Sequence, residues 1–363
     1  MNDRSNFVLL TFGRGSAALR EGLSVAQRIG DTLWVANDET TSLERLTIQR
    51  AAPGDGVICD EHQSFPLMAY LDLPLPEPDE EIDIEGLAYD PDQGYLWVVG
   101  SHSLKRKEAE ADKPAQKNIK RLSTVEADGN RFLLARIPVV QQHDSHELAW
   151  EVAGGERTPA QLHGNALGND LTREIALDDQ LRDFLRIPGK DNGFDIEGMA
   201  VIGSRLLLGL RGPVLRGWTV LLEIEPELEA DSSDTLVLKK IGPEGRRYRK
   251  HFFELDGLGV RDLCVSGKDL LILAGPTMDL DGPVRVFRWR GGFADGEELV
   301  VFSEQLEAVL EVPFGHGDDH AEGMCLFGRG EGGGEVLLIV YDAAAQSRKR
   351  GELGVEGDLF ILK

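Results

Sequence analysis

Four glutamates, each followed by glycine, are the residues best placed to share a site. They are Glu21, Glu85, Glu197 and Glu322, and a fifth related segment carries Arg261 in the same place. In two copies an aspartate stands two residues earlier, in the phrase Asp-Ile-Glu-Gly, and a histidine takes that place in the last copy. These three residues are Asp83, Asp195 and His320.

Carboxylates that converge on one axis repel each other and raise each other's pKa values unless a positive charge lies among them. Oxygen ligands favour Ca²⁺, Mg²⁺ or Mn²⁺ over zinc. The pattern therefore predicts a divalent cation, and Arg261 is the alternative counter-charge. The predicted ligands are Glu21, Glu85, Glu197, Glu322, Asp83 and Asp195.

The same repetition also fits a purely architectural role. Glycine eases a tight turn, and a glutamate can bond to the backbone of the neighbouring repeat. A catalytic site rarely needs the same residue from every repeat, so this alternative stays open.

Histidines and arginines near the acidic residues could complete a hydrolytic site. His102 or His320 could act as a general base, and Arg211 with Arg261 could bind an anionic substrate. The basic loops at Arg211, Lys105 and Arg348 could equally be counter-ions in a very acidic protein. The sequence contains no phosphate-binding loop, nucleophile elbow or dinucleotide fingerprint.

The elements that must position these residues form a repeat of about sixty residues. Each unit starts with a short apolar strand at the Glu-Gly pair, followed by a strongly apolar second strand and two weaker ones. Leu96 to Val99 and Leu270 to Leu273 are typical second strands, because continuous apolar runs indicate burial on both faces.

Such a repeat predicts an all-β fold, a single β-propeller domain over residues 1–363. Five blades are recognised and six are possible, because the interval from Glu85 to Glu197 is nearly double and His146 could start a further blade. We favour a helical insertion near 141–190 there, with Asn169 as helix N-cap. The N-terminal strand, Phe7 to Phe12, is expected to close the last blade.

In a propeller the start of the first strand and the end of the second meet on one face. Asn37-Asp38, Ser101-His102, Arg211 and Tyr341-Asp342 end second strands and should join the glutamates at the mouth of the channel. The sequence thus predicts a funnel of convergent acids with a few histidines and arginines.

Composition excludes several classes of partner. Lysine plus arginine total 39 against 63 acidic residues, and a net charge of -24 disfavours nucleic acid and anionic membranes. No run has the length of a membrane span, and the start is not typical of a signal peptide. Three scattered cysteines, Cys59, Cys264 and Cys325, indicate reduced thiols and a cytoplasmic location.

One phrase carries a family resemblance. Lys190 to Gly198, continuing through Leu206 to Pro213, resembles an uncharacterised bacterial family of domains of unknown function. That resemblance covers nearly the whole chain and implies a propeller-like fold without an established activity. The Asp-x-Glu-Gly strand starts also look like those of esterase-like phytase propellers, which implies metal-assisted phosphoester hydrolysis. Arg261 replaces the glutamate in the fifth repeat, so the ring is not fully acidic, and this disfavours a site with several calcium ions.

Two classes of function remain. One is a divalent-metal-dependent hydrolase of a small anionic phosphoester or lactone at the mouth of the channel. The other is a non-catalytic propeller that binds or scaffolds a protein partner through its face or the 141–190 segment.

Overall fold

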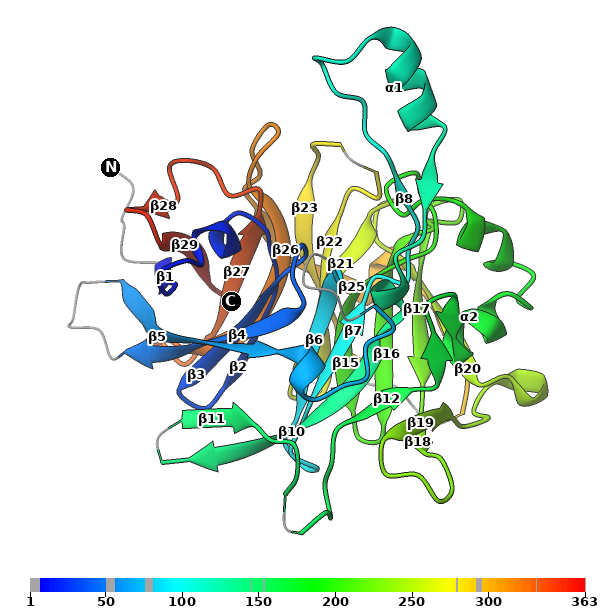
Figure 1. Ribbon diagram of the computed structural model, residues 1–363, viewed down its shortest axis with the longest axis horizontal. Coiled ribbons are helices and arrows are strands. Elements are labelled where there is room, and N and C mark those ends of the chain that lie inside the picture. The colour runs from blue at the N-terminus through cyan, green and yellow to red at the C-terminus, as the bar shows by residue number, and fades with distance from the viewer. Residues whose placement is uncertain are drawn as a thin grey trace.

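The first strands of five sheet units form a closed ring. The computed structural model describes residues 7–49, 56–75, 81–143, 145–152, 154–278, 280–291, 296–330 and 332–362 (Figure 1). The first strands contact one another in cyclic order and the last returns to the first. They are β2 (Leu23–Ile29), β6 (Ile84–Asp90), β15 (Asp195–Ile202), β21 (Gly259–Ser266) and β26 (His320–Arg329).

Each first strand pairs antiparallel with a buried second strand. The second strands are β3 (Thr32–Asn37), β7 (Tyr95–Gly100), β16 (Arg205–Gly212), β22 (Asp269–Gly275) and β27 (Glu335–Asp342). The start of each first strand faces the end of its partner, as in the pairs Ile84 with Gly100 and His320 with Asp342. The predicted meeting of these two ends on one face is confirmed.

Further strands extend the units outward. The third and fourth strands are β4 (Ser42–Gln49) and β5 (Val57–Pro66), β10 (Leu134–Gln142) and β12 (Ala160–Leu162), β17 (Trp218–Ile224) and β20 (Tyr248–Glu254), β23 (Val284–Trp289) and β25 (Leu306–Val312), and β29 (Gly354–Ile361) and β1 (Phe7–Thr11). The short strands are β8 (Lys105–Arg106), β9 (Val125–Glu126), β11 (Ser145–Leu148), β13 (Gly164–Asn165), β14 (Gly168–Asn169), β18 (Pro226–Leu228), β19 (Thr235–Leu238), β24 (Val300–Val301) and β28 (Lys349–Arg350). The all-β prediction is confirmed.

The two ends of the chain meet in one sheet. β1 pairs antiparallel with β29 and parallel with β5, so it joins the last unit to the outer strand of the first. The N-terminal strand therefore pairs with the final unit as its sequence predicts, and it covers edges that would otherwise be open.

The segment near 141–190, predicted as a helical insertion, contains strands as well as helical turns. Part of this segment is strand: β11 forms a hairpin with β10, and β12 also pairs with β10. Only α2 (Asp170–Ile175) and the 3₁₀ turn Arg182–Arg186 are helical. The predicted N-cap is correct, since the Asn169 side chain accepts from the Thr172 amide. The helix ends early because the Asp178 carboxylate accepts from the backbone amides of Gln180 and Leu181 and makes a turn.

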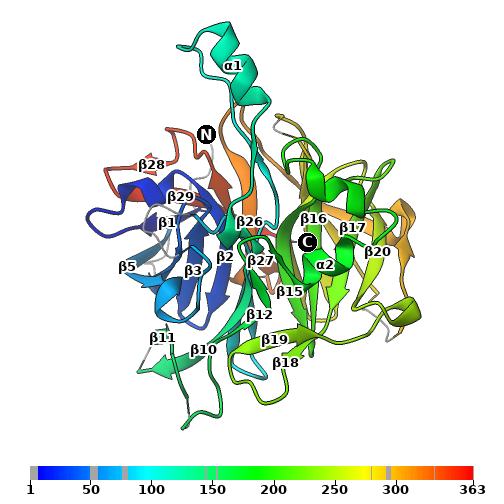
Figure 2. The ribbon, with the colours of Figure 1, turned by 45° about the vertical axis from the view of Figure 1, so that its right-hand side comes forward.

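A helical arm that the sequence did not predict projects from the body. α1 (Ala115–Leu122) lies between β8 and β9 and extends away from the sheets in both views (Figures 1 and 2). None of its residues is buried. The described residues include no helix with the length and apolar character that crossing a membrane requires.

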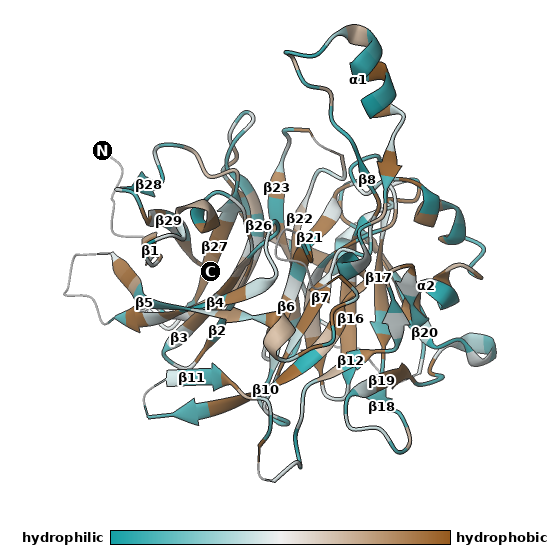
Figure 3. Cartoon of the chain, viewed as in Figure 1, coloured by the Kyte–Doolittle hydropathy of each residue, from teal (hydrophilic) through white to brown (hydrophobic). Residues whose placement is uncertain are grey.

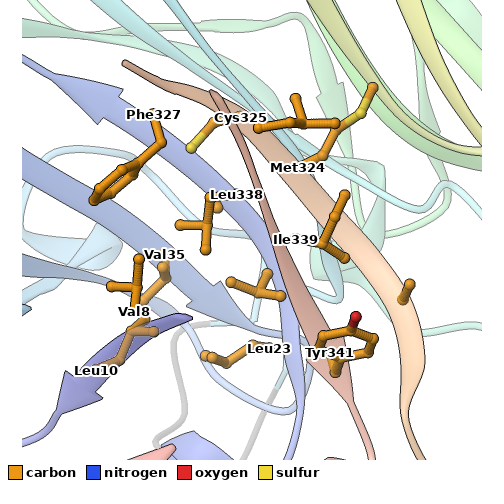
Figure 4. Close-up of a cluster of buried hydrophobic side chains, with 14 of the residues drawn as sticks. Val8, Leu10, Leu23, Val35, Met324, Cys325, Phe327, Leu338, Ile339 and Tyr341 are labelled. Carbon is orange, nitrogen blue, oxygen red and sulfur yellow. The ribbon is translucent and has the colours of Figure 1, made fainter. Parts of the chain in front are cut away.

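The core lies between neighbouring units. Apolar residues are concentrated on the central strands and polar residues toward the loops (Figure 3). Where the first and last units meet, Leu23 and Val35 belong to the same buried cluster as Met324 and Ile339 (Figure 4). This burial on both faces explains the continuous apolar runs of the second strands.

Glycines of the Glu-Gly pairs let neighbouring first strands approach closely. A Cβ on Gly86 would lie 2.9 Å from Cβ of Met199, and one on Gly198 would lie 2.6 Å from Cα of Asp262. A Cβ on Gly323 would lie 2.8 Å from Cα of Val25. These glycines therefore have an architectural role, which is close packing between units and not the tight turn that the sequence suggested.

We predict that Gly198→Ala destabilises the fold more than Gly203→Ala. Both positions have positive φ, 86° and 61°, so each substitution carries a backbone cost of about 1 kcal/mol. Only Gly198 faces a neighbouring strand, whereas nothing lies within 4 Å of a Cβ on Gly203. Overpacking should add about 1–3 kcal/mol at Gly198. Urea unfolding measures the difference, and equal losses would contradict the packing role.

Candidate functional site

A β-bulge near the start of each first strand presents the predicted site residue. The register against the second strand shifts at Glu85 in β6, at Glu197-Gly198 in β15, at Arg261 in β21 and at Glu322 in β26. A bulge adds one residue to a strand and re-aims its side chain, and such bulges are frequent beside active sites. Four of the five predicted ring residues thus lie at the same kind of β-bulge.

The first unit has its bulge at Ser24, not at Glu21. The shift in β2 falls between Leu23 and Val25, which makes Ser24 the register equivalent of Glu85. Its buried hydroxyl donates to the Ile84 carbonyl at 2.6 Å and links two first strands. Glu21 lies before the strand, about half exposed, and pairs with Lys349. The structure does not bring Glu21 to the ring, because its Glu-Gly pair is three residues out of register.

Arginines hold the buried glutamate of the ring. Glu197 is almost fully buried and accepts from Arg211 at 2.7 Å and from Arg261 at 3.2 Å. Arg261 also donates to Glu322 at 2.8 Å. Each guanidinium also donates to a backbone carbonyl, Arg211 to Thr277 and Arg261 to Pro276. Arg261 is thus a counter-charge within the ring, the alternative that the sequence left open.

A second layer of acids lies beside the ring. Asp83 pairs with Arg131 at 2.8 Å, and Arg131 also binds Glu81 at 2.6 Å. Asp195 lies 3.8 Å from Arg211. The pKa of Asp195 is raised to about 7, because burial and the negative charge of Glu197 outweigh the positive charge of Arg211.

Asp38 and Asp342 approach each other at the ends of β3 and β27. A Cβ on Gly22 would lie 2.5 Å from Oδ1 of Asp38 and 3.4 Å from Oδ1 of Asp342, so only glycine leaves room for both carboxylates. Burial and the negative charge of Asp342 together raise the pKa of Asp38 to about 7, although the positive charge of Lys190 acts on Asp38 to lower it.

These acids line a pocket of about 310 Å³ at the mouth of the ring. We call it the acidic pocket; carboxylates outnumber basic groups among its lining residues, which include Asp38, Asp83, Glu85, Asp195, Glu322, Asp342, Lys105, Arg106, Lys190 and Arg211. A smaller hollow adjoins it, because the two share Lys190, Arg211, Glu322 and Asp342. The volume is typical of small-molecule sites.

Glu85 is the least compensated carboxyl of the ring. No ion pair or hydrogen bond to its side chain occurs among the described residues. Burial raises the pKa of Glu85 well above its usual range, and the charges of Glu197 and Asp83 raise it further. Burial and the charge of Asp342 likewise raise the pKa of Glu322, although Arg261 opposes this. Such strongly perturbed groups in a cleft are typical of functional sites.

The described residues contain no group of three His, Cys, Asp or Glu side chains arranged to hold a metal ion. A calcium site built mostly from protein ligands would need more oxygens than these carboxylates bring together. Mg²⁺ or a similar ion needs fewer protein ligands, since it is usually bound by one or two carboxylates and keeps several waters. Asp38 and Asp342 could supply these two carboxylates.

The two predicted histidines differ in position. His102 is buried and does not line the acidic pocket; its Nδ1–H donates to the Gly100 carbonyl, and its Nε2 accepts from Asn169. Burial lowers the pKa of His102 to about 4. Both ring nitrogens are engaged, so this geometry gives His102 a structural role. His320 lines the adjoining hollow, with Nε2 3.7 Å from Asp281 Oδ1.

Sequence reasoning left several site residues out of the predicted ligand and catalytic sets. Asp38 and Asp342 were placed in the funnel by the strand-end argument but were not expected to act as a pair. Arg131 gave no signal, because it stands in a 3₁₀ turn (Gly129–Phe132) outside the repeat. Lys190 precedes the Asp-Ile-Glu-Gly phrase by several residues, and only the chain path brings it to the pocket.

We predict that stability falls as pH rises through neutrality, in the presence of chelator. An unfolded aspartate titrates near 3.8, whereas folded Asp38 does so at about 7, so the folded state retains a proton that the unfolded state loses. This stabilisation is present below pH 4 and is lost as pH passes 7. Asp38→Asn mimics the protonated acid and should show a smaller decrease between about pH 5.5 and about pH 8. Urea unfolding tests this, with the surface change Asp256→Asn as control; equal decreases in all three proteins would contradict it.

Comparison with known proteins gives a family and a general likeness of fold. No curated protein matches the sequence. A putative oxidoreductase (glucose dehydrogenase) from Thermus thermophilus is 12% identical, covering 98% of this chain and 100% of that one, with a TM-score of 0.39. The Cps50 (Swd1) β-propeller domain of Myceliophteria thermophila is 8% identical, with 95% and 98% covered and a TM-score of 0.32. The PQQ-bound aldose sugar dehydrogenase of Streptomyces coelicolor is 12% identical, with 98% and 99% covered and a TM-score of 0.33.

None of these likenesses assigns an activity. The match to a family model is far more extensive, because it spans residues 22–358 and so includes all five first strands, from β2 to β26. The chain therefore belongs to the family described as protein of unknown function DUF3616.

Proposed function

We propose that this protein is a five-bladed propeller whose acidic pocket hydrolyses a small anionic phosphoester with the help of a hydrated divalent cation. The cyclic contacts of the five first strands support the blade count. The observation that carries the function is the approach of Asp38 and Asp342 beside Gly22, at a ring where arginines compensate Asp83, Glu197 and Glu322.

The cation would be Mg²⁺ or Mn²⁺, held by Asp38 and Asp342 with water in its remaining positions. When bound, such an ion polarises a phosphoryl oxygen and offsets the negative charge that builds up during the reaction. Placing a positive charge between the two carboxylates would also remove the repulsion that raises the pKa of Asp38.

The protein groups would handle the protons. His320 accepts a proton from the attacking water, and Asp281 stabilises the resulting imidazolium. The water oxygen bonds to phosphorus while the bond from phosphorus to the leaving oxygen breaks, and that oxygen takes a proton from Glu85. Burial favours the protonated form of Glu85, as a general acid requires. Arg211 and Arg261 fix Glu197, and both line the hollow beside the acidic pocket, where they add positive charge near the substrate.

We predict that Mg²⁺ or Mn²⁺ stabilises the chelator-treated protein and that Asp342→Asn abolishes this. Saturation at about a hundred times the dissociation constant adds about 2.7 kcal/mol, a rise of a few degrees in Tm. Glu39→Gln is the matched control, since it removes the same charge beside Asp38 and should keep the response. Turnover of p-nitrophenyl phosphate should follow the same pattern among the variants. A shift that persists in Asp342→Asn, or no shift with either ion, would overturn the cation site.

The α1 arm supports a second candidate, a scaffolding role through self-association. α1 carries Lys117, Lys120 and Arg121, and Ile119 is 68% exposed between them. A basic helix with a bare apolar side chain complements the acidic surface of another copy, because the chain has a net charge of -24. The second copy is therefore the partner that charge favours.

We predict that sedimentation equilibrium at low salt detects association through this arm. Ile119→Asp or moderate salt should return the protein to a monomer, since one removes the apolar contact and the other screens the charges. Leu167→Asp is the control, because Leu167 is more exposed than Ile119 but lies elsewhere. A protein that is monomeric at all concentrations, or association unaffected by Ile119→Asp, would rule out this role.

A further inference from the structure

One side of the site is apolar. The smaller hollow that shares four residues with the acidic pocket is also lined by Met278, Leu280 and Phe314. These side chains are 44%, 61% and 43% exposed, although all three are large and apolar. Exposed apolar groups rimmed by charged residues mark binding sites more often than chance exposure does.

Backbone contacts hold this apolar side in place. Arg211 and Arg261, which bind Glu197, also donate to the carbonyls of Thr277 and Pro276 at 3.0 and 2.9 Å. The loop that carries Met278 and Leu280 is therefore attached to the ionic network of the ring. Asp281 of the same loop accepts from the Gly317 amide at 2.9 Å, which ties this loop to the one that carries Phe314.

The hollow limits what can bind there. Its volume is about 40 Å³, which is room for a few heavy atoms, such as a short alkyl chain or the edge of an aromatic ring. Four of its charged residues, Lys190, Arg211, Glu322 and Asp342, are shared with the acidic pocket, and Arg261 and Asp281 line the hollow as well. A ligand with its phosphoryl group at Asp342 would thus extend its next group over Leu280 and Phe314.

We propose that the substrate is a phosphoester of an apolar alcohol, aryl or short alkyl, whose apolar part lies against Met278, Leu280 and Phe314. This inference rests on the proposed function and specifies its substrate class. The apolar side chains contribute to binding of the leaving group and take no part in proton transfer, because they carry no titratable group.

Calorimetric titration in the presence of Mg²⁺ tests this with two stable probes, phenylphosphonate and methylphosphonate. The head group is the same in both, so their difference reports the apolar contact alone. We expect phenylphosphonate to bind about tenfold more tightly, a difference of about 1.4 kcal/mol. Leu280→Ser should reduce this ratio to about threefold or less while leaving methylphosphonate affinity unchanged, and Phe314→Ser should act in the same direction. Leu167→Ser, at an exposed leucine that does not line the hollow, should keep the wild-type ratio.

The outcomes separate the two proposals. Equal affinity of both probes for the wild-type protein, or an unchanged ratio in both serine variants, would overturn the apolar subsite while the phosphoryl site stands. Failure of both probes to bind would overturn the phosphoryl site, and with it the subsite that depends on it.

Discussion

The bulge in each first strand is the constraint on which the rest of this structure depends. It inserts one residue where five strands converge, and it turns that residue toward the neighbouring units. Beside it, the neighbouring strands come so close that Gly86, Gly198 and Gly323 cannot carry a side chain. Close packing and charge concentration therefore arise from the same short segment, and substitution there affects both.

Some acids of the ring are compensated by arginines and others are not. This difference distinguishes the acids with a structural role from those of the candidate site. Glu197 has two arginine partners and Asp83 is held by Arg131, so these acids stabilise the ring as ion pairs. Removing one partner of such a buried pair leaves an uncompensated charge, which makes these arginines structural. Glu85 has no arginine partner in the described part of the chain, and the charge of Asp38 is only partly offset by that of Lys190. Burial and neighbouring acids therefore favour protonation of both groups or a bound cation. The uncompensated acids, rather than the repeated ones as such, define the site.

Segments outside the repeat complete the pocket. Arg131 comes from a 3₁₀ turn, Lys190 from the segment after α2, and Lys105 and Arg106 from the base of the arm. Buried polar contacts hold α2 and its following turn in place, with Asp178 bound by Tyr248 at 2.5 Å and by Lys250 at 2.7 Å. The ring strands thus supply the acidic residues of the pocket, and the segments outside the repeat supply most of its basic residues.

The sequence by itself determined the strand order, the buried second strands and the face on which the acids gather, because these follow from hydrophobic periodicity and from the antiparallel pairing of consecutive strands. Only the tertiary structure decided which acids are paired. Ser24, not Glu21, occupies the first bulge, since register depends on how β2 packs between β6 and β26. His102 is turned away to bind Asn169, and Asp38 meets Asp342 across the closure of the ring. Such contacts join residues far apart in the chain, and no local pattern encodes the distance between them.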